Sequence, residues 1–469
     1  MKADIVIIGG GLAGMSAAYE AVAQGLKPIV VETRGRPGGL IASAKLAGVP
    51  FDIGAESWAT RSPVVGDLVD ELDLERTDPT GRSWVWNQQL QRAYPIPEGT
   101  LGLPADIDAP EVLTAIGADG VARAKQDLTM GPDVAADAED LASLISRRVG
   151  DAVLNHLVRP VAGGIHTADP SKLAADAVTP GLRAGMRRTG SLLLAAKELA
   201  ERNPGPKVAQ TRGGMFRLIE ALEREVVTAD GTMLLRHAAT QLARDGDAWR
   251  VTVQATQRGA DPAAEPVPTG PQISLETERV IVALPGPLAM KLLAGVVTAP
   301  LWELPLGAPI AHQVLMIDHH GLDDGPRGSG LLITEPGNVD QPIRAKALSH
   351  LSYKWGWMSE VLAPGRHILR MSYGRLGEEY PNPTVDSALA EANRLLDLDM
   401  TAEDVVASML IRWDGQLAPQ TPEHREKVTQ FHEAIKHYPG LEVTGAWVAG
   451  SGFAAVVPHG RTATKALVS

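Results

Sequence analysis

The sequence contains no cysteine. Disulfide cross-links, thiolate catalysis, zinc or iron–sulfur sites with cysteine ligands, and a flavin tethered through a cysteinyl thioether are therefore excluded. We predict no metal site of another kind. A chain without disulfides fits the cytoplasm, and that is where we expect the protein.

Long apolar runs and an excess of positive charge are also missing. Residues 281–297 form an apolar stretch, but Pro285, Pro287 and Lys291 interrupt it, and a membrane span needs about eighteen or more apolar residues. The net charge of −12 at pH 7 argues against a nucleic-acid binder, because phosphates demand a basic surface. Segment 105–142 is rich in Asp and Glu and has no basic amphipathic face, so we expect at most peripheral membrane contact.

The 469 residues are too many for one ordinary hydrophobic core, and we expect two or three domains. An apolar run at 3–8, a helical pattern at 12–24 and a second apolar run at 28–31 predict a β–turn–α–β unit. Short strand candidates recur farther along and predict a mostly antiparallel sheet, distinct from the parallel N-terminal sheet. These candidates are residues 312–317, 331–334, 345–351, 367–373 and 405–413.

The remaining elements follow from apolar periodicity and turn residues. Helices are expected at 66–74, 138–148, 192–201 and 216–227. Strands are expected at 249–255 and 273–284, with the Pro-, Ala- and Gly-rich loop 257–271 between them. A helix at 422–436, a strand at 441–448, a glycine loop and a last helix complete the expected order.

The strongest motif is the Gly-Gly-Gly-Leu-Ala-Gly cluster at residues 9–14, between the first strand and the first helix. Its first glycine allows a tight turn, the second lets main-chain N–H groups approach a pyrophosphate, and the third lets the helix pack closely on the strand. Glu32 ends the next strand about twenty residues on, where a carboxylate can bind an adenosine ribose. The alternative is a glycine-rich turn without a ligand.

A second glycine cluster, in two parts, and a third cluster near the C-terminal helix distinguish a flavoprotein from a nicotinamide-only dehydrogenase. Residues 36–40 (Arg-Pro-Gly-Gly-Leu) and 52–57 (Asp-Ile-Gly-Ala-Glu-Ser) provide close main-chain approach for a longer, extended cofactor. Residues 449–453 (Ala-Gly-Ser-Gly-Phe) precede a helix whose dipole would stabilise negative charge on a reduced flavin. Each cluster alone is also explained as a turn or a helix end, but the three in this order favour a flavin.

Several stretches resemble the oxygen-dependent porphyrinogen oxidases, which are relatives of the monoamine oxidases in the FAD-dependent amine oxidase superfamily. Beyond the glycine clusters, the resemblance is carried by residues 51–57, 94–104, 147–151 and 160–173. It runs nearly from end to end of the chain. The middle two of these stretches are rather specific to the family, whereas the first and last glycine clusters occur in many flavoproteins.

The resemblance implies a fold and a division into domains. The fold class is α/β, with a discontinuous Rossmann-like FAD-binding domain, an antiparallel-sheet substrate domain and a helical insertion. The expected FAD-binding domain comprises residues 1–80, 205–295 and 425–469, the helical insertion, similar to a membrane-binding domain, comprises 81–204, and the substrate-binding domain comprises 296–424.

The resemblance also implies non-covalent FAD and assigns its binding residues. Near the pyrophosphate and the ribose it places Gly9, Gly11, Leu12, Ala13, Gly14, Glu32 and Thr33. Along the flavin it places Gly39, Leu40, Gly54, Ala55, Glu56, Ser57, Trp413, Ser451, Gly452 and Phe453, with Ala239 at the adenine. No side chain is expected to act as a catalytic acid or base, because the flavin N5 accepts the electrons.

For the substrate, the resemblance indicates Arg82 at a propionate and the Gly164 carbonyl at the tetrapyrrole centre. The family's usual Gly-Val-Tyr-Ala-Gly is Gly-Ile-His-Thr-Ala at 164–168, so His166 either shapes this pocket or is a packed loop histidine. The alternative interpretation of Arg82 is a solvated surface residue. Further candidates for anionic groups are Arg92, Arg183, Arg187 and Arg188, of which the last three equally suit a solvated helix face. With only four phenylalanines in the chain, Trp355 and Trp357 are the candidates for an aromatic that stacks on the substrate.

The implied reaction is the O₂-dependent aromatisation of a porphyrinogen, which removes six electrons and releases three H₂O₂. Composition rich in Ala, Arg and Asp and poor in Lys is typical of a high-GC bacterium, and porphyrinogen oxidases of such bacteria generally act on coproporphyrinogen III. We therefore expect coproporphyrinogen III, with hand-over of the product to a ferrochelatase. Protoporphyrinogen IX oxidase, an amine oxidase or carotenoid desaturase, and a flavin-free escort-type binding protein are the alternatives.

Overall fold

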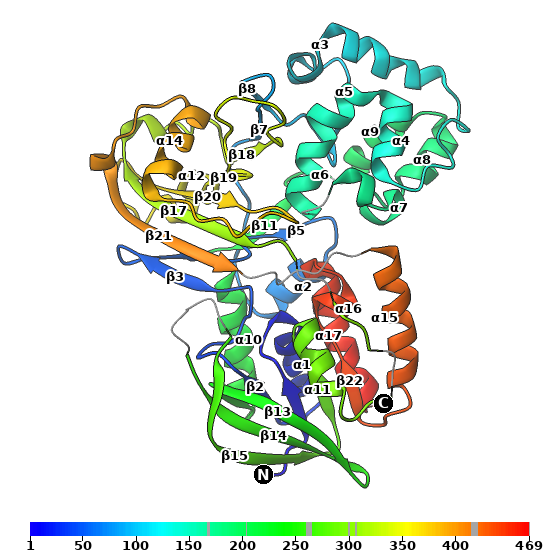
Figure 1. Cartoon of the computed structure of the whole chain (residues 1–469), viewed down its shortest axis with the longest axis vertical. Helices are drawn as coiled ribbons and strands as arrows, with labels where there is room; N and C mark the ends of the chain where they lie inside the picture. Colours follow the sequence, from blue (N-terminus) through cyan, green and yellow to red (C-terminus); the bar gives the residue numbers. More distant parts are fainter. Residues whose placement is uncertain are drawn as a thin grey trace. The chain divides into compact units, whose positions relative to one another are not determined.

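Two compact units make up the chain in the computed structural model, which describes residues 1–166, 169–202, 204–258, 265–298, 301–304, 307–413 and 421–468 (Figure 1). The first unit comprises Met1–Asp78, Lys207–Gly307 and Trp413–Ser469. The second unit comprises Pro79–Pro206 and Ala308–Arg412, and thus contains the predicted helical insertion together with most of the predicted substrate-binding segment.

A five-stranded parallel sheet forms the centre of the first unit. Its strand order is β12 (Thr232–Leu235), β2 (Pro28–Glu32), β1 (Ile5–Ile8), β16 (Val280–Val282) and β22 (Leu441–Val443). All four residues of the central strand β1 are buried, as expected for a parallel sheet that is covered on both faces. The predicted Rossmann-like α/β fold is confirmed by this sheet.

Alternate residues of β1 face two different layers. Ile5 and Ile7 pack into a core with four helices, α1 (Leu12–Ala23), α2 (Val64–Glu71), α10 (Phe216–Thr228) and α17 (Phe453–Val468). Val6 and Ile8 pack into a second core. That core is shared with α11 (Gly286–Leu293) and with an antiparallel sheet of β13 (His237–Asp245), β14 (Ala248–Gln257) and β15 (Val267–Thr277).

Two predicted strands are wrong in their extent. The run 273–284 is divided between β15 and β16, which belong to different sheets, because Thr277 Oγ1 accepts a hydrogen bond from the Arg279 N–H at 3.1 Å and turns the chain. The run 441–448 leaves the sheet after Val443, since Gly445 has φ of 133° and helix α16 (Ala446–Ala449) follows it. Apolar runs of this length do not distinguish a strand from a buried turn or helix.

The second unit contains a seven-stranded sheet. Its order is β21 (Val405–Trp413), β17 (Ile310–Asp318), β20 (Arg366–Tyr373), β19 (Ala347–His350), β18 (Gly330–Ile333), β7 (Ser83–Asn87) and β8 (Arg92–Pro95). The pairs β17–β20, β20–β19, β19–β18 and β7–β8 are antiparallel, and β18–β7 is parallel. The predicted mostly antiparallel sheet is therefore confirmed.

Helices form the rest of the second unit. They are α3 (Pro110–Lys125), α4 (Leu141–Val149), α5 (Asp151–Val153), α6 (Arg159–His166), α7 (Ala175–Val178), α8 (Leu182–Thr189) and α9 (Leu192–Arg202), with α14 (Val385–Leu396) against the sheet and the short helices α12 (Leu351–Lys354) and α13 (Gly356–Ser359) after β19. Helix α4 begins three residues later than predicted because the Asp140 side chain accepts the Ser143 N–H and caps it. Among the described residues, no helix is both long enough and apolar enough to cross a bilayer.

A buried ion pair holds these helices together. Arg148 and Asp127 are both completely buried, and Arg148 Nε lies 2.5 Å from Asp127 Oδ1. The guanidinium also donates to the carbonyls of Gly131 and Gly190, while Asp127 Oδ2 accepts from Ser191 Oγ. Because the remaining donors and acceptors are satisfied, the pair can be kept in an apolar core.

Candidate functional site

The turn between β1 and α1 is built from glycines that approach other main-chain atoms closely. Gly9 has φ of 110°, and a Cβ there would lie 2.6 Å from the Ala283 carbonyl oxygen. A Cβ on Gly14 would overlap the carbonyl oxygen of Gly9. At Gly11, by contrast, a Cβ would meet no protein atom within 4 Å, so this side of the turn is open.

Helix α1 begins at this open side, and no side chain of the described residues caps its N-terminus. Its N-cap, Gly11, offers no side-chain cap, and the first turn contains no acidic residue. The first N–H groups of a helix lack intrahelical partners and carry partial positive charge. Leu12, Ala13 and Gly14 thus present free amides beside an open cradle, which suits a pyrophosphate.

Glu32 supports the same turn from the end of β2. Its Oε2 accepts the Gly10 N–H at 2.9 Å, and its Oε1 accepts the Arg34 N–H at 2.8 Å and the Thr33 hydroxyl at 3.2 Å. A carboxylate has about four lone-pair sites, so these bonds leave room to accept a ribose hydroxyl. Glu32 therefore shapes the turn and keeps lone pairs that can accept a further hydrogen bond.

The second glycine cluster lies directly against the first. The Gly38 N–H donates to the Gly10 carbonyl at 2.7 Å, and Gly11 and Gly38 form an isolated β-bridge. A Cβ on Gly39 would lie 3.3 Å from the Gly11 Cα. Leu40 continues the contact, since its carbonyl accepts the Ala55 N–H at 3.0 Å. The structure thus brings residues 9–14, 38–40 and 54–55 together.

Trp413 lies on the segment around Gly54. Its indole Nε1–H donates to the Ile53 carbonyl at 2.9 Å, and a Cβ on Gly54 would lie 3.2 Å from the Trp413 ring. Any side chain at residue 54 would also overlap the Leu40 carbonyl. Gly54 is consequently required by packing as well as by any cofactor.

Two buried polar residues, Asp52 and Gln210, position residues 52–57. Asp52 opens the predicted motif, whereas sequence reasoning did not single out Gln210. Gln210 Nε2 donates to Asp52 Oδ2 at 2.9 Å and to the Glu56 carbonyl at 2.8 Å. Asp52 also accepts the main-chain N–H groups of Met215 and Phe216. Ser57 follows directly in the chain. The only available signal was the Asp that opens this motif, because Gln210 is far away in sequence.

The third glycine cluster reaches the first through helix α17. Gly450 has φ of 103°, Ser451 and Gly452 follow, and α17 begins at Phe453, which packs on the core that contains Leu12. Farther along α17, the Thr464 hydroxyl donates to the Ala17 carbonyl at 2.8 Å. Ala239, the remaining predicted contact, is a half-buried residue of β13 beside a register shift.

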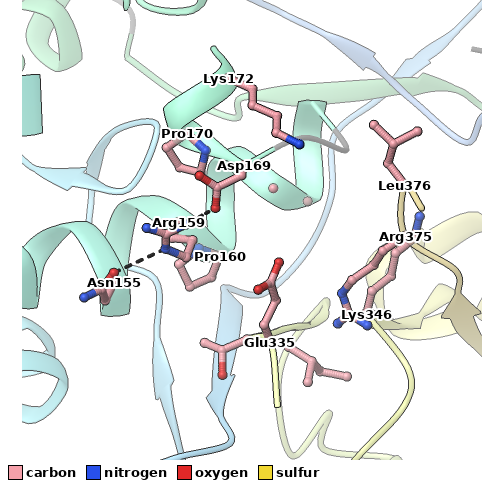
Figure 2. A pocket seen from close by; sticks show the side chains of 14 residues that line it. Asn155, Arg159, Pro160, Asp169, Pro170, Lys172, Glu335, Lys346, Arg375 and Leu376 are labelled. Carbon is pink, nitrogen blue, oxygen red and sulfur yellow. Dashed lines mark hydrogen bonds and ion pairs between the residues drawn. The ribbon is translucent and has the colours of Figure 1, made fainter. Parts of the chain in front are cut away.

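The second unit contains a pocket of about 210 Å³, shown in Figure 2. Its walls come from α6 and the residues after it, and from the ends of β18, β19 and β20. The lining residues are Asn155, Arg159, Pro160, Gly163, Gly164, Asp169, Pro170, Lys172, Ile333, Thr334, Glu335, Lys346, Arg375 and Leu376. Gly164, predicted at the substrate, lines it, and a Cβ there would lie 2.8 Å from the Leu332 side chain.

The other predicted substrate residues are distributed differently. The Arg82 side chain is exposed, forms an ion pair with Glu111, and is not among the residues that line the pocket. The His166 side chain lies outside the described residues. Trp355 is completely buried and Trp357 is 6% exposed, so the interpretation that one of them stacks on a substrate is wrong.

The predicted arginine cluster is divided among local partners. Arg183 donates to Asp176 and to the carbonyls of Ala136 and Ala138, and Arg188 forms an ion pair with Glu198. Arg187 is exposed in the last turn of α8. Arg187 and Arg188 are exposed, as the alternative of a solvated helix face expects, whereas the Arg183 side chain is only 12% exposed.

Comparison with known proteins decides the family. Residues 12–309, more than half of the chain, match the family of flavin containing amine oxidoreductases. The chain belongs to this family. Membership implies a flavin cofactor, and the open glycine cradle with its uncapped helix in the first unit fits one.

Similar members of the amine oxidoreductase family confirm the predicted resemblance. The coproporphyrinogen III oxidase of Bacillus subtilis is 25% identical over 493 aligned residues, which cover 99% of this chain and 97% of that protein. The coproporphyrinogen III oxidase of Staphylococcus aureus is 24% identical over 489 residues and covers 100% of both chains. A crystal structure from Exiguobacterium, assigned as a protoporphyrinogen oxidase, superposes with a TM-score of 0.80 at 20% identity, covering 99% of this chain and 98% of that one, which confirms the fold.

Proposed function

We propose that this flavin-containing oxidoreductase binds FAD non-covalently in its first unit and oxidises coproporphyrinogen III to coproporphyrin III. The observation that carries most weight is the meeting of Gly11 with Gly38 and Gly39 beside the uncapped N-terminus of α1. The substrate is proposed from the two full-length relatives that are named coproporphyrinogen III oxidases.

In this proposal the chain's own residues hold and orient the cofactor. The α1 amides at Leu12–Gly14 bind the pyrophosphate, Glu32 and Thr33 bind the ribose, and Ala239 lies at the adenine. The flavin ring lies along Gly39, Leu40, Gly54–Ser57, Trp413 and Ser451–Phe453. Gly164, His166 and Arg82 are proposed for the substrate, and the three-domain division predicted above is retained.

When bound, the flavin supplies a two-electron acceptor that O₂ can reoxidise. Six electrons and six protons leave the porphyrinogen overall, and three O₂ accept them as three H₂O₂. The protein positions the macrocycle and excludes water, so we assign no side chain as acid or base. We also propose that the enzyme works in the cytoplasm, with at most peripheral membrane contact, and passes its product to a ferrochelatase.

The test is oxidation of both porphyrinogens by the purified protein. We expect a yellow preparation with absorbance at about 450 nm, FAD released by acid without proteolysis, and porphyrin formation that is faster with coproporphyrinogen III than with protoporphyrinogen IX. Oxygen uptake should be about three O₂ per porphyrin.

Three outcomes would replace the proposal by an alternative. Preference for protoporphyrinogen IX would make the chain a protoporphyrinogen oxidase. Peroxide release from simple amines, with none from porphyrinogens, would indicate an amine oxidase. A colourless protein that takes up no added FAD would indicate an escort-type binding protein.

A further inference from the structure

Charge is distributed unevenly around the pocket of the second unit. Its lining contains the cations Arg159, Lys172, Lys346 and Arg375 and the acids Asp169 and Glu335, an excess of two positive charges in a chain whose net charge is −12. A cationic pocket on an acidic protein is not a consequence of overall composition. It indicates that the pocket receives an anionic group.

The cations on the two sides of the pocket differ in their partners. On the α6 side, Arg159 forms an ion pair with Asp169 and donates to Asn155 Oδ1 at 3.2 Å. Figure 2 shows this pair opposite Lys346 and Arg375, which lie close together on the other side. The charge of Arg159 is thus already neutralised within the protein. Lys172, the other cation on this side (Figure 2), is exposed to solvent.

Lys346 and Arg375 are poorly compensated. In the described part of the chain, the Lys346 ammonium makes no hydrogen bond or ion pair. Arg375 Nη2 is buried and has no hydrogen-bond partner there, while its Nη1 donates to the Arg344 carbonyl at only 3.5 Å and lies 3.7 Å from the Glu378 carboxylate. Burial, together with repulsion from Arg375, lowers the pKa of Lys346 to about 8. Two half-buried cations without adequate partners are unfavourable in an empty pocket and favourable once an anion binds.

The pocket's size and walls define the ligand further. About 210 Å³ is below the roughly 300–1,000 Å³ of sites that enclose a whole drug-sized ligand, so the pocket receives one edge of a larger molecule. Pro160, Gly163, Ile333 and Leu376 provide apolar walls beside the cations. An apolar ring edge that carries carboxylates matches both features.

We propose that Lys346 and Arg375 bind the propionates that coproporphyrinogen III has and protoporphyrinogen IX lacks. This inference rests on the proposed function. Where coproporphyrinogen has four propionates, protoporphyrinogen has two, with neutral vinyl groups in the other two positions. A vinyl group would leave both cations desolvated without an anion, whereas a propionate pairs with them through charge-assisted hydrogen bonds. Lys346 and Arg375 are therefore specificity-determining residues.

The test compares Lys346→Met and Arg375→Met with the unchanged protein. KM and kcat are measured for both porphyrinogens, and the Kd for coproporphyrin III is measured by fluorescence titration. We expect each substitution to raise KM and Kd for the coproporphyrin compounds by about tenfold to a hundredfold, and KM for protoporphyrinogen IX by less than about twofold. Lys346→Arg should restore most of the affinity, because it keeps a cation at this position.

Lys125→Met is the matched control. It removes one positive charge from the same unit, at an exposed ion pair with Asp108, and should leave both substrates unaffected. Unchanged KM and Kd in Lys346→Met and Arg375→Met, or an equal loss with both porphyrinogens, would overturn the inference. Failure of the unchanged protein to oxidise any porphyrinogen would instead overturn the proposed function. Bound-flavin absorbance and thermal unfolding establish that each variant is folded.

Discussion

Glu32 Oε2 accepts the main-chain N–H of Gly10 at 2.9 Å, across twenty-two positions of sequence. The bond joins the end of β2 to the turn after β1, and a second bond from the Arg34 N–H to Oε1 fixes the carboxylate plane. The residue expected to bind a ribose therefore also determines the shape of the turn that is expected to bind the pyrophosphate. Loss of the Glu32 carboxylate should therefore weaken cofactor binding both at the ribose and at the pyrophosphate turn.

Glu32→Ala is expected to weaken FAD binding by about a hundredfold, because both the ribose acceptor and the support of Gly10 are lost. Glu32→Gln should be milder, since one oxygen remains as an acceptor. FAD titration of the apoprotein, followed by flavin fluorescence, measures both. Glu278→Ala, at an exposed position of the same unit, is the control. Equal FAD affinity in all of these proteins would contradict the role given to Glu32.

Gly11→Ala separates cofactor binding from folding. Gly11 has φ of −67° and ψ of 177°, which alanine adopts without strain, and the new methyl group would meet no protein atom within 4 Å. We expect an apoprotein of unchanged thermal stability whose FAD Kd rises by about tenfold or more, because the methyl occupies the pyrophosphate's path.

Gly66→Ala is the matched control for Gly11→Ala. Gly66 lies in α2 (Val64–Glu71), also with no atom within 4 Å of an added Cβ. It should retain FAD and gain up to about 1 kcal/mol from helix propensity. If Gly11→Ala binds FAD as well as Gly66→Ala does, the open side of the turn is not the cofactor site.

Lys346→Met should stabilise the protein while it weakens substrate binding. Burial, with repulsion from Arg375 and Arg370 and against attraction by Glu378, lowers the pKa of Lys346 from 10.5 to about 8. Below pH 8 the folded protein carries this charge at a cost, so the substitution is expected to raise the free energy of unfolding by about 1 kcal/mol at pH 7. Urea unfolding without porphyrin measures it.

The lowered pKa of Lys346 also predicts how the free energy of unfolding depends on pH. Between pH 8 and about 10.5 the unfolded chain keeps the Lys346 proton that the folded chain has lost, so the contribution of this group to stability rises with pH. The stability difference between Lys346→Met and the unchanged protein should therefore shrink as pH rises from 8 to 10. A difference that stays constant with pH would show that the lysine has an ordinary pKa.

Coproporphyrin III affinity should fall as the pH rises beyond the Lys346 pKa. The pKa is about 8 in the free protein, and a bound carboxylate raises it. Arg375, Arg370 and Glu378 are the other charged groups that act on Lys346, and Glu335 lines the same pocket. Lys346→Arg should remove the decline. Persistence of the decline in that variant would place its origin elsewhere.

Arg148→Met is expected to destabilise the second unit by about 3–5 kcal/mol, because Asp127 would stay buried without its cation. The neighbouring Arg147 is the natural comparison. Its ion pair with Asp137 is exposed, so Arg147→Met should cost less than about 1 kcal/mol. Chemical unfolding of both variants tests the difference, and similar losses would show that the buried pair has no special role.

Sequence periodicity predicted the β1–α1–β2 unit and the antiparallel sheet because each element's burial pattern is local. It failed at 273–284, where one apolar run supplies strands to two sheets and only tertiary pairing determines the break. The role of the glycines in the first turn could be predicted from the sequence, because it depends on main-chain geometry alone. The role proposed for Lys346 and Arg375 could not be predicted from the sequence. It depends on the burial of the lysine and on its closeness to an arginine at the end of another strand.

The contacts between α1 and α17 constrain when the cofactor can be loaded during synthesis. The glycine turn at 9–14 is translated more than 400 residues before β22 and the helix that covers α1, which come from residues 441–443 and 453–468. Because domains generally fold as units, a nascent chain that ends before these segments has an incomplete first unit. A cofactor bound at the glycine turn can then be held stably only after residues 441–468 have been translated.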